Sequence, residues 1–158
     1  MTDGPGAIEP TDEHHWLARL VGDWTYVSGE GESRAEGTET VRMLGDLWAV
    51  AEGEGTMVGG RYLCAIGFNP ATGRFVGQWI GDMMAHPWVY DGELSSDGRS
   101  LYLMSEGPAF DGSDRLQAYR DTYEIISDDE RLQRGAYQDE NGQWIDMYVA
   151  AYRRKRTA

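Results

Sequence analysis

Cysteine is almost absent from this sequence, in which Cys64 is the one residue of its type. A single thiol cannot form an intramolecular disulfide. No charged-then-apolar leader opens the chain, and no apolar run approaches the roughly 18 residues that a membrane-spanning helix requires. Together, these absences predict a protein of the cytoplasm.

Positive charge is scarce as well. The chain has 14 Lys and Arg against 27 Asp and Glu, which gives a formal net charge of -13 at pH 7. Because this charge repels phosphate backbones and anionic lipid surfaces, we expect neither a nucleic acid nor a membrane as a partner. The one basic run, residues 153–156, is interpreted as the solvated end of the last strand.

Histidines are few and are poorly spaced for a metal site. His14 and His15 are adjacent on a predicted helix and therefore point about 100° apart, so they cannot share one ion. The third histidine, His86, has no partner of metal-ligand type at a suitable spacing. We therefore expect no metal and no cofactor such as haem.

Aromatic residues and glycine are, by contrast, abundant. The 158 residues include six Trp, nine Tyr, three Phe and 21 Gly, and this length suffices for one domain with a substantial core. Residues 1–10 hold little apolar material and are predicted to be a flexible lead-in. Residues 11–155 are predicted to form a single domain, in which the scattered glycines mark turns, bulges and bends.

A short helix is predicted after Thr11, which can cap it, and Gly22 is expected to end it. From Trp24 onward, short runs rich in aromatic and β-branched residues alternate with turn residues, which is typical of antiparallel strands joined by hairpins. Closure of such a meander removes its two exposed edges. The sequence therefore predicts an all-β fold, a single antiparallel up-and-down barrel of about ten strands with a short N-terminal helix. The strands are predicted over residues 24–29, 36–44, 47–54, 61–68, 74–81, 86–94, 99–106, 116–126, 131–138 and 143–153.

The segment Gly22-Asp23-Trp24, at the head of the first strand, resembles the Gly-X-Trp signature of lipocalins and related calycin barrels. Those barrels place a basic side chain from near the last strand across the Trp, and Arg153 or Arg154 is suitably located. A cation over an indole face is a favourable contact. The resemblance implies a lipocalin-like barrel with the Trp buried at its base. The lack of a leader and of disulfide cysteines argues against extracellular transport.

A second set of motifs extends over nearly the whole chain. The motifs are Glu13-His14-His15-Trp16-Leu17, Gly37-Thr38-Glu39-Thr40-Val41-Arg42, Gly77-Gln78-Trp79-Ile80-Gly81, Trp88-Val89-Tyr90-Asp91-Gly92 and Ser105-Glu106-Gly107-Pro108. These segments resemble the domain-of-unknown-function 1579 family of bacterial proteins. The resemblance implies the same barrel and a bacterial, intracellular setting. It transfers no catalytic residues, because the family has no settled activity.

Two ionisable groups are candidates for chemistry. His86 begins a predicted strand beside Met83 and Met84, and its ring can act as a general base or an axial metal ligand. A hydrogen-bonded histidine at the barrel rim is the alternative. Cys64 lies in an apolar strand, where a thiol is expected to behave as a small hydrophobic residue.

Carboxylates in the later strands offer a further candidate. Glu106, Asp121 and Glu124 lie where alternation aims some polar groups at the interior. If the strand face that carries Glu106 points inward, this carboxyl is placed to move protons, with Arg120 or Arg42 as its natural partner. The sequence does not decide which face of these strands points inward, because both faces of several strands carry apolar groups.

Five aromatic residues are candidate walls of a ligand site, because a barrel of this size commonly holds a small cavity. They are Trp48, Trp79, Trp88, Tyr90 and Tyr148. Plain core packing is the alternative.

The favoured function is the binding of a small hydrophobic or amphipathic molecule in the barrel cavity. The alternative is an enzyme of acid-base chemistry, such as an isomerase, cyclase or hydrolase, which acts on a hydrophobic substrate in the same cavity. Its catalytic candidates are Glu106, His86 and Arg120. A role in assembly or with a protein partner is a third hypothesis, and self-association stays open.

Overall fold

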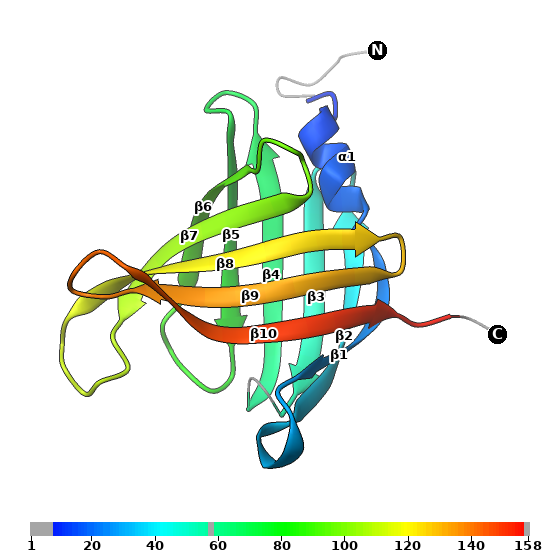
Figure 1. Ribbon diagram of the computed structural model, residues 1–158. Helices are drawn as coiled ribbons and strands as arrows, with labels where there is room; N and C mark the ends of the chain where they lie inside the picture. The colour runs from blue at the N-terminus through cyan, green and yellow to red at the C-terminus, as the bar shows by residue number, and fades with distance from the viewer. Residues whose placement is uncertain (1–7, 57–58, 157–158) are drawn as a thin grey trace.

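The computed structural model of this protein describes residues 8–56 and 59–156. One short helix precedes a series of strands that wrap around a common interior (Figure 1). The elements are α1 (Asp12–Ala18), β1 (Gly22–Ser28), the 3-10 helix η1 (Gly31–Ser33), β2 (Ala35–Leu44), β3 (Trp48–Gly55), β4 (Gly60–Asn69), β5 (Arg74–Gly81), β6 (Trp88–Leu94), β7 (Ser100–Pro108), β8 (Leu116–Ser127), β9 (Glu130–Gln138) and β10 (Trp144–Arg154).

The described strands form a closed antiparallel barrel in which consecutive strands pair and β1 pairs with β10. The predicted all-β, up-and-down barrel is therefore confirmed, and so is the short N-terminal helix. Strand β6 begins two residues later than predicted, at Trp88, because Pro87 has no backbone N–H to donate to a ladder. Most of the predicted lead-in, residues 1–7, lies outside the described residues. No helix of the described part of the chain is long and apolar enough to cross a membrane.

Helix α1 covers one end of the barrel, where it packs against β3 and β4 (Figure 1). The backbone N–H of Thr11 donates to His14 Nδ1 at 2.9 Å, and His14 Nε2 donates to the Phe68 carbonyl oxygen at 3.0 Å. Trp16 Nε1 donates to the Gly98 carbonyl oxygen at 2.7 Å. The buried polar atoms of the helix are thus hydrogen-bonded to strand β4 and to the hairpin between β6 and β7.

The interior next to α1 is solidly packed with apolar side chains from most of the strands. Burial of this area is the main favourable contribution to folding. The buried residues of this region include Leu17, Leu20, Trp24, Ile66, Phe75, Leu101, Leu103 and Ala150.

Trp24 lies at the base of this packed region and is 2% exposed. Its Nε1 donates to the Leu20 carbonyl oxygen at 2.9 Å, and the guanidinium carbon of Arg154 lies 4.3 Å from the centre of its ring. The predicted burial of Trp24 under a C-terminal arginine is therefore confirmed. Arg153 instead points outward, where it pairs with Glu130 at 3.4 Å.

Steric contact with Arg154 explains why the first residue of the Gly-X-Trp segment, Gly22, is a glycine. A Cβ atom on Gly22 would lie 2.1 Å from Nη1 of Arg154, and the residue has a φ of +146°. The guanidinium also donates to the carbonyl oxygens of Val21 and Arg19, the latter at 3.2 Å. A larger residue at position 22 would displace the arginine from Trp24.

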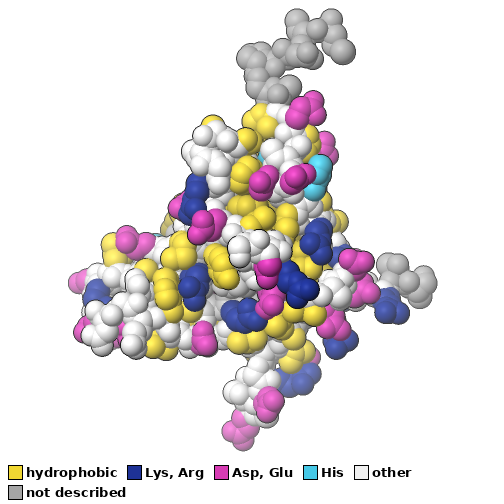
Figure 2. Space-filling model, turned by 45° about the horizontal axis from the view of Figure 1, so that its top comes forward, with side chains coloured by type: hydrophobic (Ala, Val, Ile, Leu, Met, Phe, Trp, Pro, Cys, Tyr) yellow, Lys and Arg dark blue, Asp and Glu magenta, His cyan; other side chains and the backbone are white. Residues whose placement is uncertain are grey.

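The outer surface carries charges of both signs. Figure 2, which brings the helix-bearing end forward, shows Lys and Arg side chains among acidic and apolar ones on that face. In the basic run, Arg153 pairs with Glu130, and Arg156 lies 3.9 Å from Asp129. The run is therefore partly neutralised by acidic neighbours.

Candidate functional site

The half of the interior farther from α1 is hollow and holds a cavity of about 340 Å³. The wall includes residues of the connection between β5 and β6 and of the loop between β7 and β8, which lie at the end of the barrel opposite α1 (Figure 1). The rings in the wall are those of Tyr62, Trp79, Trp88, Tyr90, Phe110, Tyr119, Tyr123, Tyr148 and Tyr152. The cavity is thus mainly aromatic and faces the uncovered end of the barrel.

Two glycines make room for rings of the cavity wall. A Cβ atom on Gly53 would lie 2.3 Å from the ring of Tyr62, and one on Gly135 would lie 2.1 Å from the ring of Tyr148. Each glycine lies directly opposite the tyrosine of the adjacent strand, Gly53 on β3 opposite Tyr62 on β4 and Gly135 on β9 opposite Tyr148 on β10. The rings can therefore lie against the sheet. The centre of the barrel is therefore left free.

The mouth of the cavity is an aromatic cluster. The ring of Trp88 meets that of Tyr119 edge-on with centroids 4.8 Å apart, and its Nε1 donates to the sulfur of Met84 at 3.1 Å. Phe110 is 63% exposed and lies 6.2 Å from Trp88 and 6.1 Å from Tyr119 between ring centroids. Such an exposed ring beside a cavity is available to a ligand.

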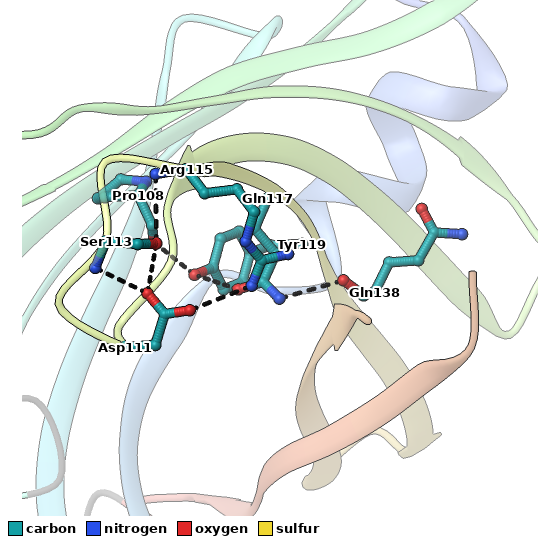
Figure 3. A network of polar contacts seen from close by, with 7 residues as sticks. All are labelled: Pro108, Asp111, Ser113, Arg115, Gln117, Tyr119 and Gln138. Carbon is teal, nitrogen blue, oxygen red and sulfur yellow. Dashed lines mark hydrogen bonds and ion pairs between the residues drawn. The ribbon is translucent and has the colours of Figure 1, made fainter. Parts of the chain in front are cut away.

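Polar contacts hold the loop that carries Phe110 (Figure 3). The Ser113 hydroxyl donates to Asp111 Oδ1 at 2.6 Å, and Arg115 Nη2 donates to Asp111 Oδ2 at 3.2 Å. These contacts, with Ser113 first, lower the pKa of Asp111 to about 2. Tyr119 donates to the Pro108 carbonyl oxygen at 2.6 Å and so fixes the base of the loop.

The floor of the cavity carries a buried ion pair. Arg131 pairs with Glu39, and both side chains are almost fully buried. The Tyr62 hydroxyl donates to the other oxygen of Glu39 at 2.6 Å, and Arg131 Nη1 donates to Gln133 Oε1 at 3.3 Å. A buried charge needs such partners, because leaving it alone costs several kcal/mol.

The guanidinium of Arg131 also lies among aromatic faces. Its central carbon is 3.9 Å from the ring centre of Tyr152, 4.8 Å from that of Trp24 and 5.5 Å from that of Tyr123. Burial alone would lower the pKa of Arg131, but Glu39 and the neighbouring tyrosines raise it above its usual value. Arg131 therefore stays charged and links the cavity floor to the packed core.

Asp121 is the second carboxylate of the cavity wall, and it has a different environment. Tyr90 donates to its Oδ2 at 2.6 Å, and Tyr148 donates to its Oδ1 at 3.4 Å. None of the salt bridges in the described part of the chain includes Asp121. Burial raises the pKa of Asp121 to about 6, although the two tyrosines oppose the shift. This carboxyl therefore exchanges its proton near neutral pH.

A continuous polar chain connects the two carboxylates. Gln133 Nε2 donates to the Tyr148 hydroxyl at 3.3 Å, while the Gln133 carbonyl oxygen accepts from Arg131. Tyr148 in turn donates to Asp121. Arg131 pairs directly with Glu39, so the Gln133 amide and the Tyr148 hydroxyl together connect the ion pair to Asp121.

Four of the predicted wall residues line the cavity, namely Trp79, Trp88, Tyr90 and Tyr148. Trp48 does not. It is 38% exposed and lies on the outer face of β3, where its ring covers Gly67 on β4. Its neighbour Ala49 occupies the inward position, so strand alternation directs Trp48 outward and corrects the prediction.

The three predicted catalytic candidates also lie away from the cavity lining. Glu106 is exposed on the outer face of β7, because Leu101, Leu103 and Ser105 take the inward positions. Arg120 points outward from β8 and stacks over Trp144, with its guanidinium carbon 4.5 Å from that ring centre. The outward faces are themselves partly apolar, which is why periodicity left the direction open.

His86 lies in the connection that precedes β6, next to the mouth. Its Nε2 donates to the Glu106 carbonyl oxygen at 3.0 Å, and its ring meets that of Trp88 edge-on at 4.7 Å. These contacts match the alternative considered for His86, a hydrogen-bonded histidine at the rim of the barrel. Within the described residues, no three His, Cys, Asp or Glu side chains are grouped so that they would hold a metal ion.

Cys64 is buried in the apolar interior, as predicted for a small hydrophobic residue. Burial raises the pKa of its thiol above the usual value. The thiol is therefore kept in its neutral, unreactive form.

The polar residues that the sequence did not single out are Glu39, Arg131 and Gln133. Asp121 was considered together with Glu106 and Glu124, and Glu106 was favoured from the sequence. The sequence does contain a pattern that indicates Asp121, since Tyr119, Asp121 and Tyr123 share one face of β8 with Ile125. A carboxylate at the centre of such an apolar face is buried or functional. No comparable signal marks Arg131, because charged or polar residues occupy both faces of β9.

Comparison with known proteins agrees with this architecture. No curated protein matches the chain. Among solved structures, the barrel is similar to that of the S-type phycobiliprotein lyase CPES from Guillardia theta, with a TM-score of 0.55 and 12% sequence identity over 92% of this chain and 94% of that one. At this identity, the similarity is one of fold.

The family comparison is more specific. Residues 9–154 match the family described as "Protein of unknown function (DUF1579)". The match spans α1 and all strands of the barrel, and it confirms the resemblance found in the sequence motifs. The chain therefore belongs to the domain-of-unknown-function 1579 family.

Proposed function

We propose that this protein binds a small hydrophobic or amphipathic molecule in the barrel cavity. The observation that carries the proposal is the cavity of about 340 Å³ with its aromatic wall, a volume in the range of roughly 300–1,000 Å³ typical of small-molecule pockets. Aromatic rings supply contact area with little conformational freedom to lose. The proposed ligand-binding residues are Trp79, Trp88, Tyr90 and Tyr148, with Asp121 as the main polar contact.

The architecture around the cavity supports a preformed site. The ion pair of Glu39 with Arg131 holds the floor, and hydrogen bonds to Asp111 and from Tyr119 hold the loop at the mouth. A wall fixed before binding lowers the entropy lost when the ligand binds.

An enzyme acting by acid-base chemistry in the same cavity is the second candidate function. Asp121 favours it, because its pKa of about 6 lets the carboxyl both accept and donate a proton near neutral pH. The protein of similar fold from Guillardia theta is named a lyase. In this version of the hypothesis, Asp121 takes the role for which the sequence had suggested Glu106, His86 or Arg120.

We propose that the protein acts in the bacterial cytoplasm and that residues 11–155 form one domain, whichever of the two functions it has. The lone Cys64 supports this setting, and the net charge of -13 supports a small molecule rather than a nucleic acid or a membrane as the partner.

Native mass spectrometry of the freshly purified protein is the direct test, since a retained ligand adds its mass to that of the chain. Titration with the apolar probe N-phenyl-1-naphthylamine is the second test, with probe fluorescence as the signal. Probe binding should fall in the Trp79→Phe and Trp88→Phe variants and persist in the control variant Trp48→Phe. A protein that carries no ligand and leaves the probe unbound would contradict the proposal. Conversion of a retained ligand would favour the enzyme.

A further inference from the structure

The charges around the cavity do not balance. Glu39 and Asp121 are the acidic residues of the lining, and the neighbouring cation is Arg131. Arg131 is committed to Glu39 and to the rings that enclose it. One carboxylate of the described cavity is therefore left without a counter-charge when it is ionised.

The atoms of Asp121 leave room for a further donor. An ionised carboxylate offers about four acceptor positions, and Asp121 accepts one close hydrogen bond from Tyr90 and one long one, of 3.4 Å, from Tyr148. Asp121 also lines the cavity. The remaining acceptor positions are thus within reach of a ligand.

The rings that share the wall with Asp121 suit a cation as well. The faces of Tyr and Trp carry negative potential and attract ammonium groups, and Trp79 and Trp88 lie in the same lining. The net charge of -13 adds a long-range attraction for cations. An anionic ligand would meet repulsion from all of these groups.

We infer that the ligand of this cavity carries a basic nitrogen on an apolar body, and that this nitrogen pairs with the Asp121 carboxylate. The inference rests on the proposed binding function and specifies its ligand class. The apolar body occupies the space between the rings, while the ammonium group donates to Asp121 beside Tyr90 and Tyr148. The ligand thus supplies a counter-charge that Asp121 does not find among the described residues.

Binding of such a cation should depend on pH through Asp121. Because burial raises the pKa of Asp121 to about 6, the carboxyl is mostly protonated at pH 5 and ionised at pH 7.5. Burial holds the pKa values of the surrounding groups above their usual values, so these groups stay neutral in that range. They are Tyr90 on β6, Tyr123 on β8, Tyr148 on β10 and Cys64 on β4. The pair of Glu39 and Arg131 lies beyond Gln133.

The test uses three naphthalene probes that differ in charge. These are 1-naphthylmethylamine, 1-naphthalenemethanol and 1-naphthoic acid, and their affinities are measured for the wild-type protein, Asp121→Asn and the control Glu106→Gln. We expect the amine to bind the wild type most tightly and the acid least. Asp121→Asn should weaken the amine roughly ten- to hundredfold, as for other hydrogen bonds to charged groups, and change the alcohol little. Glu106→Gln removes an outer carboxylate and should change neither.

The pH series keeps the inference testable even if Asp121→Asn fails to fold. In the wild type, the affinity for the amine should rise about tenfold from pH 5 to pH 7.5 as Asp121 ionises, while that for the alcohol stays level. Equal binding of amine and alcohol, with no effect of pH or of Asp121→Asn, would overturn the inference and leave the proposed function intact. Failure of all three probes to bind would overturn both.

Discussion

The two halves of the barrel interior are built on opposite rules. In the closed half, around Trp24, Leu101 and Arg131, the rings are packed and the buried charge has a partner. In the open half, around Trp88 and Asp121, the rings line a cavity, and the carboxyl has no cationic partner among the described residues. Both halves belong to the same strands. The comparison teaches that stability and binding are separated along the barrel axis rather than between domains.

This separation has a physical basis. An empty apolar volume forgoes dispersion contacts, and an unpaired buried carboxylate costs free energy. The closed half offsets both with its core and with the hydrogen bonds of α1 and Arg154. Changes in the closed half should therefore reduce stability, and changes in the open half should alter binding or even stabilise the fold.

The largest effect is expected at the base of the closed half. Trp24→Ala should lower the free energy of unfolding by about 3–5 kcal/mol, as for other large buried aromatics, because it removes a ring that packs under Arg154 and Arg131. Urea denaturation measures this loss. The control is Trp48→Ala, in which an outer-face ring is removed and about 1 kcal/mol or less should be lost. Equal losses would contradict the distinction between the two positions.

Breaking the ion pair should come next. Arg131→Met leaves Glu39 buried without its cation and should cost about 3 kcal/mol, with partial recovery in the double variant Arg131→Met, Glu39→Gln. The same substitution in the more exposed pair of Arg134 with Glu124 should cost less than about 1 kcal/mol. Thermal and urea unfolding of the four proteins would show the order. A loss at Arg134 as large as that at Arg131 would contradict the assignment of stability to the buried pair.

Asp121→Asn is expected to stabilise the protein, and only above the pKa of the carboxyl. The folded protein holds this pKa at about 6, above the usual value of 3.8, so ionisation of Asp121 between about pH 4 and pH 6 favours the unfolded chain. Removing the charge should therefore raise the unfolding free energy by about 3 kcal/mol at pH 7.5 and by much less at pH 4. Parallel stability curves for the variant and the wild type would exclude the raised pKa.

The smallest change in stability is expected at the mouth. Phe110→Ala removes an exposed ring and should change the unfolding free energy by no more than about 0.5 kcal/mol. In this variant, a bound apolar probe should leave the cavity several times faster than in the wild type. Stopped-flow measurement of probe release tests this effect. Leu116→Ala, which truncates a similarly exposed residue outside the lining, is the control and should leave the release rate unchanged.

Sequence patterns predicted the barrel well, because strand length, hairpin turns and the Gly-X-Trp segment are local features. Each strand is fixed by residues a few positions apart, and closure follows from the number of hairpins. The contact of Arg154 with Trp24 is long-range, but the calycin resemblance supplied it.

The site was harder to predict, because it depends on which face of each strand points inward. Tyr102 and Met104 gave β7 an apolar outer face, and this made Glu106 look like an interior residue. In the structure this face points outward, and the Arg120 side chain covers part of it, with its guanidinium carbon 5.9 Å from the ring centre of Tyr102. The pairing of Glu39 with Arg131 joins strands far apart in sequence, and no local pattern encodes such a pair.

The seam between β1 and β10 bears on how the protein is made. This pairing joins residues up to 130 positions apart, as in the pair of Trp24 with Arg154. Contacts of such high sequence separation slow folding, since the entropy of loop closure must be lost before they form. During synthesis on the ribosome, β1 cannot pair with β10 until the C-terminal strand has been made. Until then, the edge of β1 that later pairs with β10 is exposed to other chains. We therefore expect the contact of the Arg154 guanidinium with Trp24 to form late in folding.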